Sequence, residues 1–280
     1  MADPNDIPHL IKLLDDPSDT VRAALAEEFV AFGSKLEPLM DVLPEPPDVL
    51  QRQDIQNLVA DYHRDWLLRM WPDWYAMEGF AEKIETALGL LARYMNGTGY
   101  EVSLGRLLDK LAGEFLRTEA PLDGRALAEF LFEVKGYAGA KETYYDPKNS
   151  NMLYVLEAKR GIPITLAALY ILVGHRLGIS IQGCNWPGHF MARVIVDGEP
   201  MLVDGFNGGM CVTEEGFLAM QGPSLEAARH VLAQELTAEA FMARVLTNLV
   251  RAYEEGEHFA NRQLMLTLLK EVQGELRNEK

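Results

Sequence analysis

One segment near the middle of the chain would be apolar on almost every side of the helix that it forms. Residues 161–173 read GIPITLAALYILV and contain no charged side chain. A helix without a polar face has to be buried in the interior of a protein. Pro163 suits a first helical turn, and Leu177-Gly178 provides a glycine stop. The sequence therefore predicts a domain built around one central buried helix.

The residues after this helix predict a small antiparallel sheet. Residues 179–184 and 189–196 have the composition of strands, and residues 200–204 return after the hairpin signal Asp197-Gly198. With these two residues as the loop, Asp204 lies opposite residue 191 and one diagonal step from His189, within side-chain reach. The register predicts contact between the Asp204 carboxylate and the His189 imidazole. Arg193 shares the His189 face and is an alternative partner for Asp204.

The rest of the chain has helical patterns, so the predicted class is α+β, with the core embedded in a predominantly helical chain. We expect a helix pair within residues 1–45, similar to one HEAT repeat, and a break at residues 44–47, which read PEPP. Residues 50–135 predict helices over 51–70, 80–95, 102–117 and 123–135. The core is expected over residues 136–222. Residues 223–280 predict a hairpin of helices 238–253 and 257–275, similar to one tetratricopeptide unit.

Charge and composition exclude several classes of function. The 280 residues carry a formal charge of −16, which is unsuited to tracking nucleic-acid phosphates or an anionic membrane. Two cysteines form no disulfide framework, and no nucleotide-binding motif occurs, so no cofactor is expected. The longest uncharged run, residues 161–175, is too short to span a bilayer, and the first residues do not resemble a signal peptide. A cytoplasmic location is expected.

A His–Asp pair beside a buried helix that follows a glycine is half of the geometry of a cysteine hydrolase. In that geometry the nucleophile lies at the helix N-terminus, where the helix dipole lowers a thiol pKa. This helix begins with Pro163 and Thr165 instead of a cysteine. A purely structural hydrogen bond between His189 and Asp204 is the alternative interpretation.

The motifs of this region resemble the SirB1 family. They are YYDPKNS at residues 144–150, GIPIT at 161–165, PGHF at 187–190 and DGFN at 204–207. The resemblance covers about a quarter of the chain and implies a transglutaminase-like core, related in outline to papain-type cysteine enzymes. It places His189 and Asp204 at the histidine and aspartate positions of a triad. Counting back from Gly178, it places Pro163 at the position of the nucleophilic cysteine.

Three functional hypotheses follow. The first is a non-catalytic module that binds a protein or peptide, with Trp186, Asn207 and Arg193 as candidate contacts. The second is an acyl transferase or amidohydrolase in which Thr165 or Cys184 replaces the nucleophile. A first-turn hydroxyl bonded to the backbone and a buried inert thiol are the structural interpretations of those two residues.

The third hypothesis is a zinc site formed by Cys184, His189 and Asp204, although the spacing of a known zinc motif is absent. Asp146 and Asn149 are expected to fix a turn before the central helix. We favour the binding module, with no metal and no cofactor.

Overall fold

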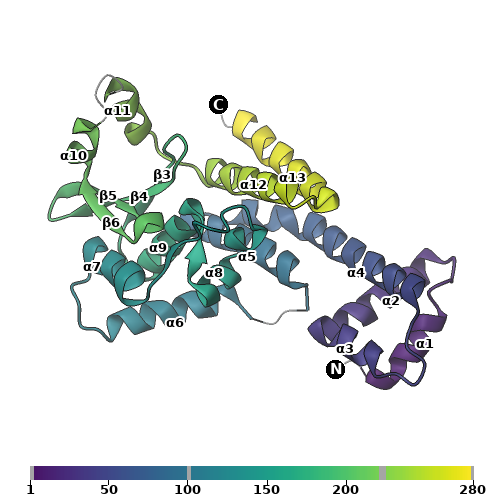
Figure 1. Ribbon diagram of the computed structural model, residues 1–280. Coiled ribbons are helices and arrows are strands. Elements are labelled where there is room, and N and C mark those ends of the chain that lie inside the picture. The colour runs from purple at the N-terminus through teal and green to yellow at the C-terminus, as the bar shows by residue number, and fades with distance from the viewer. Residues whose placement is uncertain (1–2, 100–101, 221–224, 279–280) are drawn as a thin grey trace. The chain divides into compact units, whose positions relative to one another are not determined.

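A computed structural model describes residues 3–99, 102–220 and 225–278 (Figure 1). The chain divides into two compact units. The first comprises Met1–Pro72 and Leu90–Val102, and the second comprises Asp73–Gly89 and Ser103–Lys280. The second unit contains the central helix. None of the described helices is both long enough and apolar enough to cross a membrane.

The first unit is helical. Its elements are α1 (Ile7–Lys12), α2 (Asp19–Phe32), α3 (Leu36–Asp41) and α4 (Val49–Met70), with the last turns of α5 (Phe80–Asn96). Two helices were expected before residue 45, and the structure has three. Gly33, with a φ of +53°, ends α2 as predicted, but Leu36 and Met40 then provide a further apolar face.

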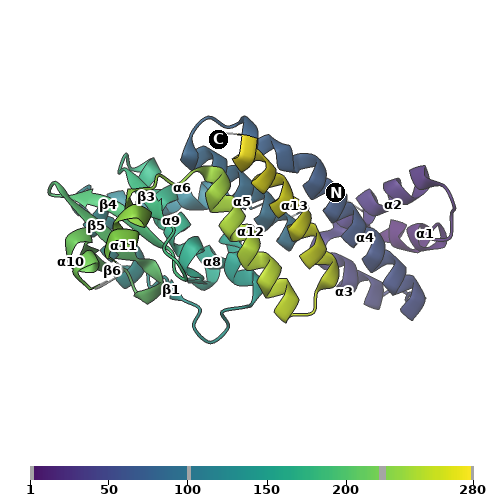
Figure 2. The same cartoon turned by 90° about the horizontal axis from the view of Figure 1, so that it is seen from above.

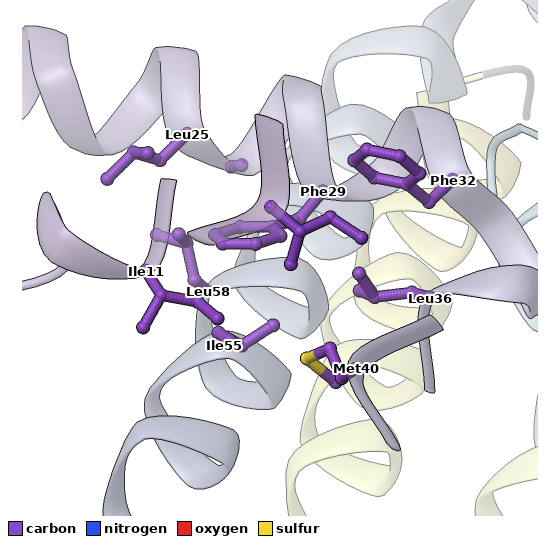
Figure 3. Close-up of a cluster of buried hydrophobic side chains, with 10 residues drawn as sticks. Ile11, Leu25, Phe29, Phe32, Leu36, Met40, Ile55 and Leu58 are labelled. Atoms are coloured by element: carbon purple, nitrogen blue, oxygen red, sulfur yellow. The ribbon is translucent and has the colours of Figure 1, made fainter. Parts of the chain in front are cut away.

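The helices of this unit bury their apolar faces on one another. Phe29 of α2 is fully buried, and α4 contributes Ile55 and Leu58 to the same core, as Figure 3 shows. Asp48 fixes the start of α4, since its carboxylate accepts from the Gln51 N–H at 2.8 Å. The helix pair therefore packs on α3 and α4. Its similarity to a HEAT repeat stays a prediction.

The second unit contains the α+β core. Its first helices are the beginning of α5, α6 (Leu104–Leu116) and α7 (Gly124–Ala128), and a π-helical turn follows at Glu129–Val134. The helix predicted over 123–135 is thus an α-helix continued by a wider turn. Short parallel strands β1 (Ala138–Gly139) and β2 (Arg160–Gly161) flank α8 (Met152–Ala158). These three elements were not predicted.

The predicted central helix is α9 (Pro163–Arg176), in which every residue from Pro163 to Gly174 is buried. It contacts β3 and β4 of a four-stranded antiparallel sheet. The strands, in sheet order, are β3 (Ile181–Cys184), β4 (Met191–Val196), β5 (Glu199–Asp204) and β6 (Met210–Thr213). The first two begin two residues later than predicted, and β6 was not predicted.

The predicted hairpin register is confirmed. Ala192 pairs with Val203 and Val196 pairs with Glu199 around the two-residue loop Asp197-Gly198. Both loop residues have positive φ, +52° and +83°, as this type of hairpin turn requires.

The chain after the sheet is helical, with α10 (Glu214–Ala219), α11 (Leu225–Ala233), α12 (Ala238–Glu255) and α13 (Phe259–Asn278). Helices α12 and α13 lie side by side in both views (Figure 1, Figure 2), as the predicted hairpin requires. Phe241 of α12 packs edge-on against Phe190 at 5.5 Å, and Glu239 is paired with Lys83 at 2.8 Å. These contacts fix α12 on the core. Its similarity to a tetratricopeptide unit stays a prediction.

Candidate functional site

His189 and Asp204 lie in direct contact. Nε2 of His189 is 2.8 Å from Oδ2 of Asp204, as the register predicted. His189 itself precedes β4 and lies in a turn, where its N–H donates to the carbonyl oxygen of Trp186 at 3.0 Å. Gly188, with a φ of +77°, permits that turn. Since a carboxylate only accepts hydrogen bonds, Nε2 carries the proton and Nδ1 is left for other contacts.

The Asp204 carboxylate is held by several donors at once. Its Oδ1 accepts from the N–H groups of Phe206 and Asn207 at 3.1 and 3.2 Å, and its Oδ2 accepts from Nδ2 of Asn207 at 2.8 Å. Burial alone would raise the pKa of Asp204, but the hydrogen bonds from His189 and Asn207 outweigh burial and hold the pKa below its usual value. Asp204 is therefore ionised at neutral pH. Asn207, predicted as a binding residue, orients this carboxylate.

The side chain of Phe132 also fixes the loop that follows Asp204. Phe132 lies on the π-helical turn and packs directly against Gly205 and Gly209 of this loop. A Cβ added to either glycine would lie 2.7 Å from the Phe132 side chain. The same ring is 6.1 Å from that of Tyr170 in α9. The π-helical turn thus fixes the loop that holds the aspartate.

The first turn of α9 contains no cysteine. Pro163 occupies its first turn. The fully buried Thr165 hydroxyl accepts from the Ile162 N–H at 3.1 Å and donates to the carbonyl oxygen of Asn149 at 2.9 Å. This contact requires a glycine at position 161, where a Cβ would lie 2.7 Å from Oγ1 of Thr165. The interpretation of Thr165 as a hydroxyl bonded to the backbone is confirmed.

The Cys184 side chain lies in a separate apolar cluster, with Met191, Leu202 and Leu232. Burial and the nearby Glu214 carboxylate raise the pKa of the Cys184 thiol to about 11. Such a thiol is protonated and inert at neutral pH. Among the described residues, no three His, Cys, Asp or Glu side chains gather as a metal site would require, so the zinc hypothesis gains no support.

Two further predicted residues contact other partners. Arg193 pairs with Glu214 at 2.6 Å, so the alternative pairing of Arg193 with Asp204 is wrong. The reason is that α10, which carries Glu214, packs beside β5 and β6. Trp186 packs edge-on against Phe217 at 4.9 Å, beside the cluster that contains Cys184.

A cavity of about 560 Å³ opens at His189 and Pro163. Phe206 and Gly188 complete the wall beside the histidine. The other lining residues come from the segment before α8, from the residue preceding α9 and from α12; they are Lys141, Tyr144, Tyr145, Asp146, Ser150, Ile162, Arg244, Asn248, Arg251 and Ala252. None of the described residues that line this cavity is a cysteine.

The segment before α8 was expected to form a turn, and its contribution to the cavity wall was not predicted. The expected turn is confirmed, because Oδ1 of Asp146 accepts from the Lys148 N–H at 2.9 Å and Nδ2 of Asn149 donates to the Thr143 carbonyl oxygen. The contribution of α12 was missed. A sequence pattern that could have indicated this contribution is the helical spacing of the polar residues Arg244, Asn248 and Arg251. This spacing places the three residues on one face of the helix.

Comparison with known proteins agrees with this geometry. Residues 100–247, more than half of the chain, match the model of a family described as the transglutaminase-like superfamily. A UPF0162 protein of Xylella fastidiosa strain Temecula1 is 37% identical over 158 residues, which cover 52% of this chain and 56% of that protein. A UPF0162 protein of Vibrio cholerae is 32% identical over 84 residues, 30% of this chain and 31% of that protein.

Human F-box only protein 21 is 30% identical over 82 residues, 29% of this chain and 13% of that protein. The chain spans about half the length, or less, of the curated relatives that it matches. No solved structure matches it significantly. With its buried helix, antiparallel sheet and His–Asp pair, the chain belongs to the transglutaminase-like superfamily.

Proposed function

We propose that the chain is a non-catalytic transglutaminase-like module, whose cavity at His189 binds a segment of a protein or peptide without forming a covalent bond. The observation that carries this proposal is the position of Pro163. It lies at the first turn of α9 and lines the same cavity as His189. A proline side chain has no atom that can attack a carbonyl carbon.

The substitutes for a nucleophile also support binding over catalysis. The hydroxyl of Thr165 is committed to backbone groups, and the thiol of Cys184 lies in an apolar cluster. Ser150, Tyr144 and Tyr145, whose side chains carry hydroxyls, also line the cavity. No hydrogen bond among the described residues joins any of these three to His189.

The intact His189–Asp204 pair favours the alternative function, an acyl transferase or amidohydrolase. In a binding module the same pair has a different use. Asp204 fixes the orientation of the imidazole, and Nδ1 of the ring then offers a positioned hydrogen-bonding group to a ligand. The pair therefore has a function that needs no nucleophile.

We further propose the finer assignments that the sequence suggests. They are membership of the SirB1 family, a cytoplasmic location, and the division into residues 1–45, 50–135, 136–222 and 223–280. The HEAT-like and tetratricopeptide-like helix pairs would offer additional surfaces to a protein partner.

Selection from a display library of random short peptides tests the proposal. We expect the wild-type protein to enrich a set of peptides that the Asn248→Trp variant does not enrich. The reason is that a large ring at this lining position would occupy the cavity. Thr247→Trp is the matched control, since Thr247 is exposed and does not line the cavity. Peptides enriched equally by Asn248→Trp, or no enrichment by the wild type, would contradict the proposal.

A further inference from the structure

The cavity carries a cluster of positive charge contributed by two segments that lie far apart in the sequence. Helix α12 contributes Arg244 and Arg251, which lie two helical turns apart on one face. Lys141 comes from the segment that follows β1. Three basic side chains thus line the same cavity as His189.

These cations lack the partners that other cations of the second unit have. Lys83, Arg176 and Arg193 each form an ion pair with a carboxylate at 2.8 Å or less. No ion pair within the described residues involves Lys141, Arg244 or Arg251.

Arg244 has one long hydrogen bond, to Oδ1 of Asn185 at 3.4 Å. The chain has 42 acidic residues for 26 basic ones, so unneutralised cations gathered in one cavity are unexpected. The cavity therefore has positive charge available for a ligand.

One carboxylate lines the cavity and another contacts His189, and among the described residues neither forms an ion pair with these three cations. Asp146 lines the cavity, but its Oδ1 accepts from the Lys148 N–H at 2.9 Å, and no ion pair among the described residues includes it. Asp204 is buried and paired with His189 at 2.8 Å. With three cations against the single carboxylate of Asp146, the lining has a net positive charge.

The remaining wall of the cavity is aromatic. The ring of Tyr144 lies edge-on to those of Tyr145 and Phe206, at 5.2 and 5.9 Å. Burial raises the pKa of Tyr144, and the charges of Arg244 and Arg251 partly oppose this, as expected where both arginines lie near the phenol. Tyrosine and arginine together are the residues enriched in surfaces that bind proteins and peptides.

The size of the cavity limits its occupant. A volume of about 560 Å³ lies within the range of about 300–1,000 Å³ that is typical of ligand sites. It accepts a few side chains of an extended segment and not a folded domain.

Resting on the proposed function, we infer that the ligand is an acidic peptide segment. Its Asp or Glu carboxylates are bound by Arg244, Arg251 and Lys141, and its backbone lies along Tyr144, Tyr145 and Phe206. Guanidinium groups suit this ligand because they bind carboxylates through paired hydrogen bonds. The negative charge of the rest of the chain repels acidic segments elsewhere, so the cavity is selective for them.

The peptides selected on the wild-type protein test this inference. We expect the cavity-dependent peptides, those that Asn248→Trp loses, to be enriched in Asp and Glu. The dissociation constant of one such peptide is then compared with that of the same peptide carrying Asn for Asp and Gln for Glu. Arg244→Glu and Arg251→Glu are measured alongside, with Lys270→Glu as the control. Lys270 is an exposed residue of α13 outside the cavity lining, so its substitution makes the same change of charge.

We expect each arginine substitution, and the neutral peptide, to weaken binding by about tenfold or more, which is the effect of losing about 1.4 kcal/mol. Lys270→Glu should change it by less than about twofold, since an exposed charge outside the cavity is screened by salt. The inference would be overturned if the cavity-dependent peptides were not enriched in Asp and Glu and bound Arg244→Glu and Arg251→Glu as tightly as the wild type. That result would leave the proposed function standing. A wild-type protein that enriches no cavity-dependent peptide would overturn both.

Discussion

Restoring a cysteine at the start of α9 tests whether this transglutaminase-like site lacks only its nucleophile. Pro163→Cys removes a ring that lines the cavity and adds an N–H in the first helical turn, where no intrahelical partner is needed. The new thiol would lie at the positive end of the helix dipole and line the same cavity as His189. Both features lower the pKa of a thiol.

The pKa of the new thiol determines the fraction of thiolate that is available to react at pH 7. A free cysteine has a pKa near 8.5 and is about 3% thiolate at pH 7, whereas a thiol at a helix N-terminus beside a histidine reaches a pKa between about 3.5 and 7.5. With a pKa of about 6, about 90% is thiolate at pH 7. Cys184, whose pKa is about 11, is ionised in only about one molecule in ten thousand at that pH.

The assay is the rate of iodoacetamide labelling of Pro163→Cys as a function of pH, followed by intact mass. We expect one thiol to react, with a rate that rises along an ionisation curve whose midpoint lies below pH 7.5. Adding His189→Ala should move this midpoint toward 8.5. Pro163→Ala controls for folding and for the two natural cysteines. A midpoint at or above 8.5 that does not respond to His189→Ala would refute the placement of Pro163 and His189 in one cavity.

Three further predictions concern stability, each measured by chemical denaturation. Asp204→Asn should lower the free energy of unfolding by about 1.5–3 kcal/mol at neutral pH, because it removes charge-assisted hydrogen bonds, including that with His189. Since the folded pKa of Asp204 is lowered, its contribution is present above the ordinary carboxyl pKa of about 3.9 and is lost as the pH falls through the lower folded value. An unchanged difference between wild type and variant at low pH would contradict this. Thr165→Val should cost about 1–3 kcal/mol, because the Ile162 N–H loses a buried acceptor; no loss would mean that the hydroxyl is free. Phe29→Ala should destabilise the first unit by about 3–5 kcal/mol, and a loss below about 1 kcal/mol would show that its core differs from that in Figure 3.

Contacts set by local geometry could be predicted from the sequence. The Asp197-Gly198 loop fixes the pairing of β4 with β5, and that register brings His189 to Asp204. The apolar run from residue 163 likewise predicts a buried helix, because no arrangement exposes it without a large loss of burial. In both cases the structure is determined by residues that are close together in the sequence.

Contacts between distant segments could not be predicted in the same way. Arg244 and Arg251 line the cavity because Phe241 packs on Phe190, and the sequence does not say which apolar surface α12 will cover. Arg193 remained an alternative partner of Asp204 for a similar reason, since its actual partner Glu214 belongs to a helix that was not predicted. Tertiary packing decides such contacts, and local patterns do not record it.

The proposed function requires that the cavity at His189 bind its ligand without covalent chemistry. The most direct test incubates the wild-type protein with a saturating amount of a cavity-dependent peptide and then measures the intact masses of both. We predict a stoichiometric complex under native conditions, with both masses unchanged after denaturation. A protein that has gained an acyl group, or a peptide that has been cleaved or deamidated by the wild type and not by His189→Ala, would contradict the proposed function.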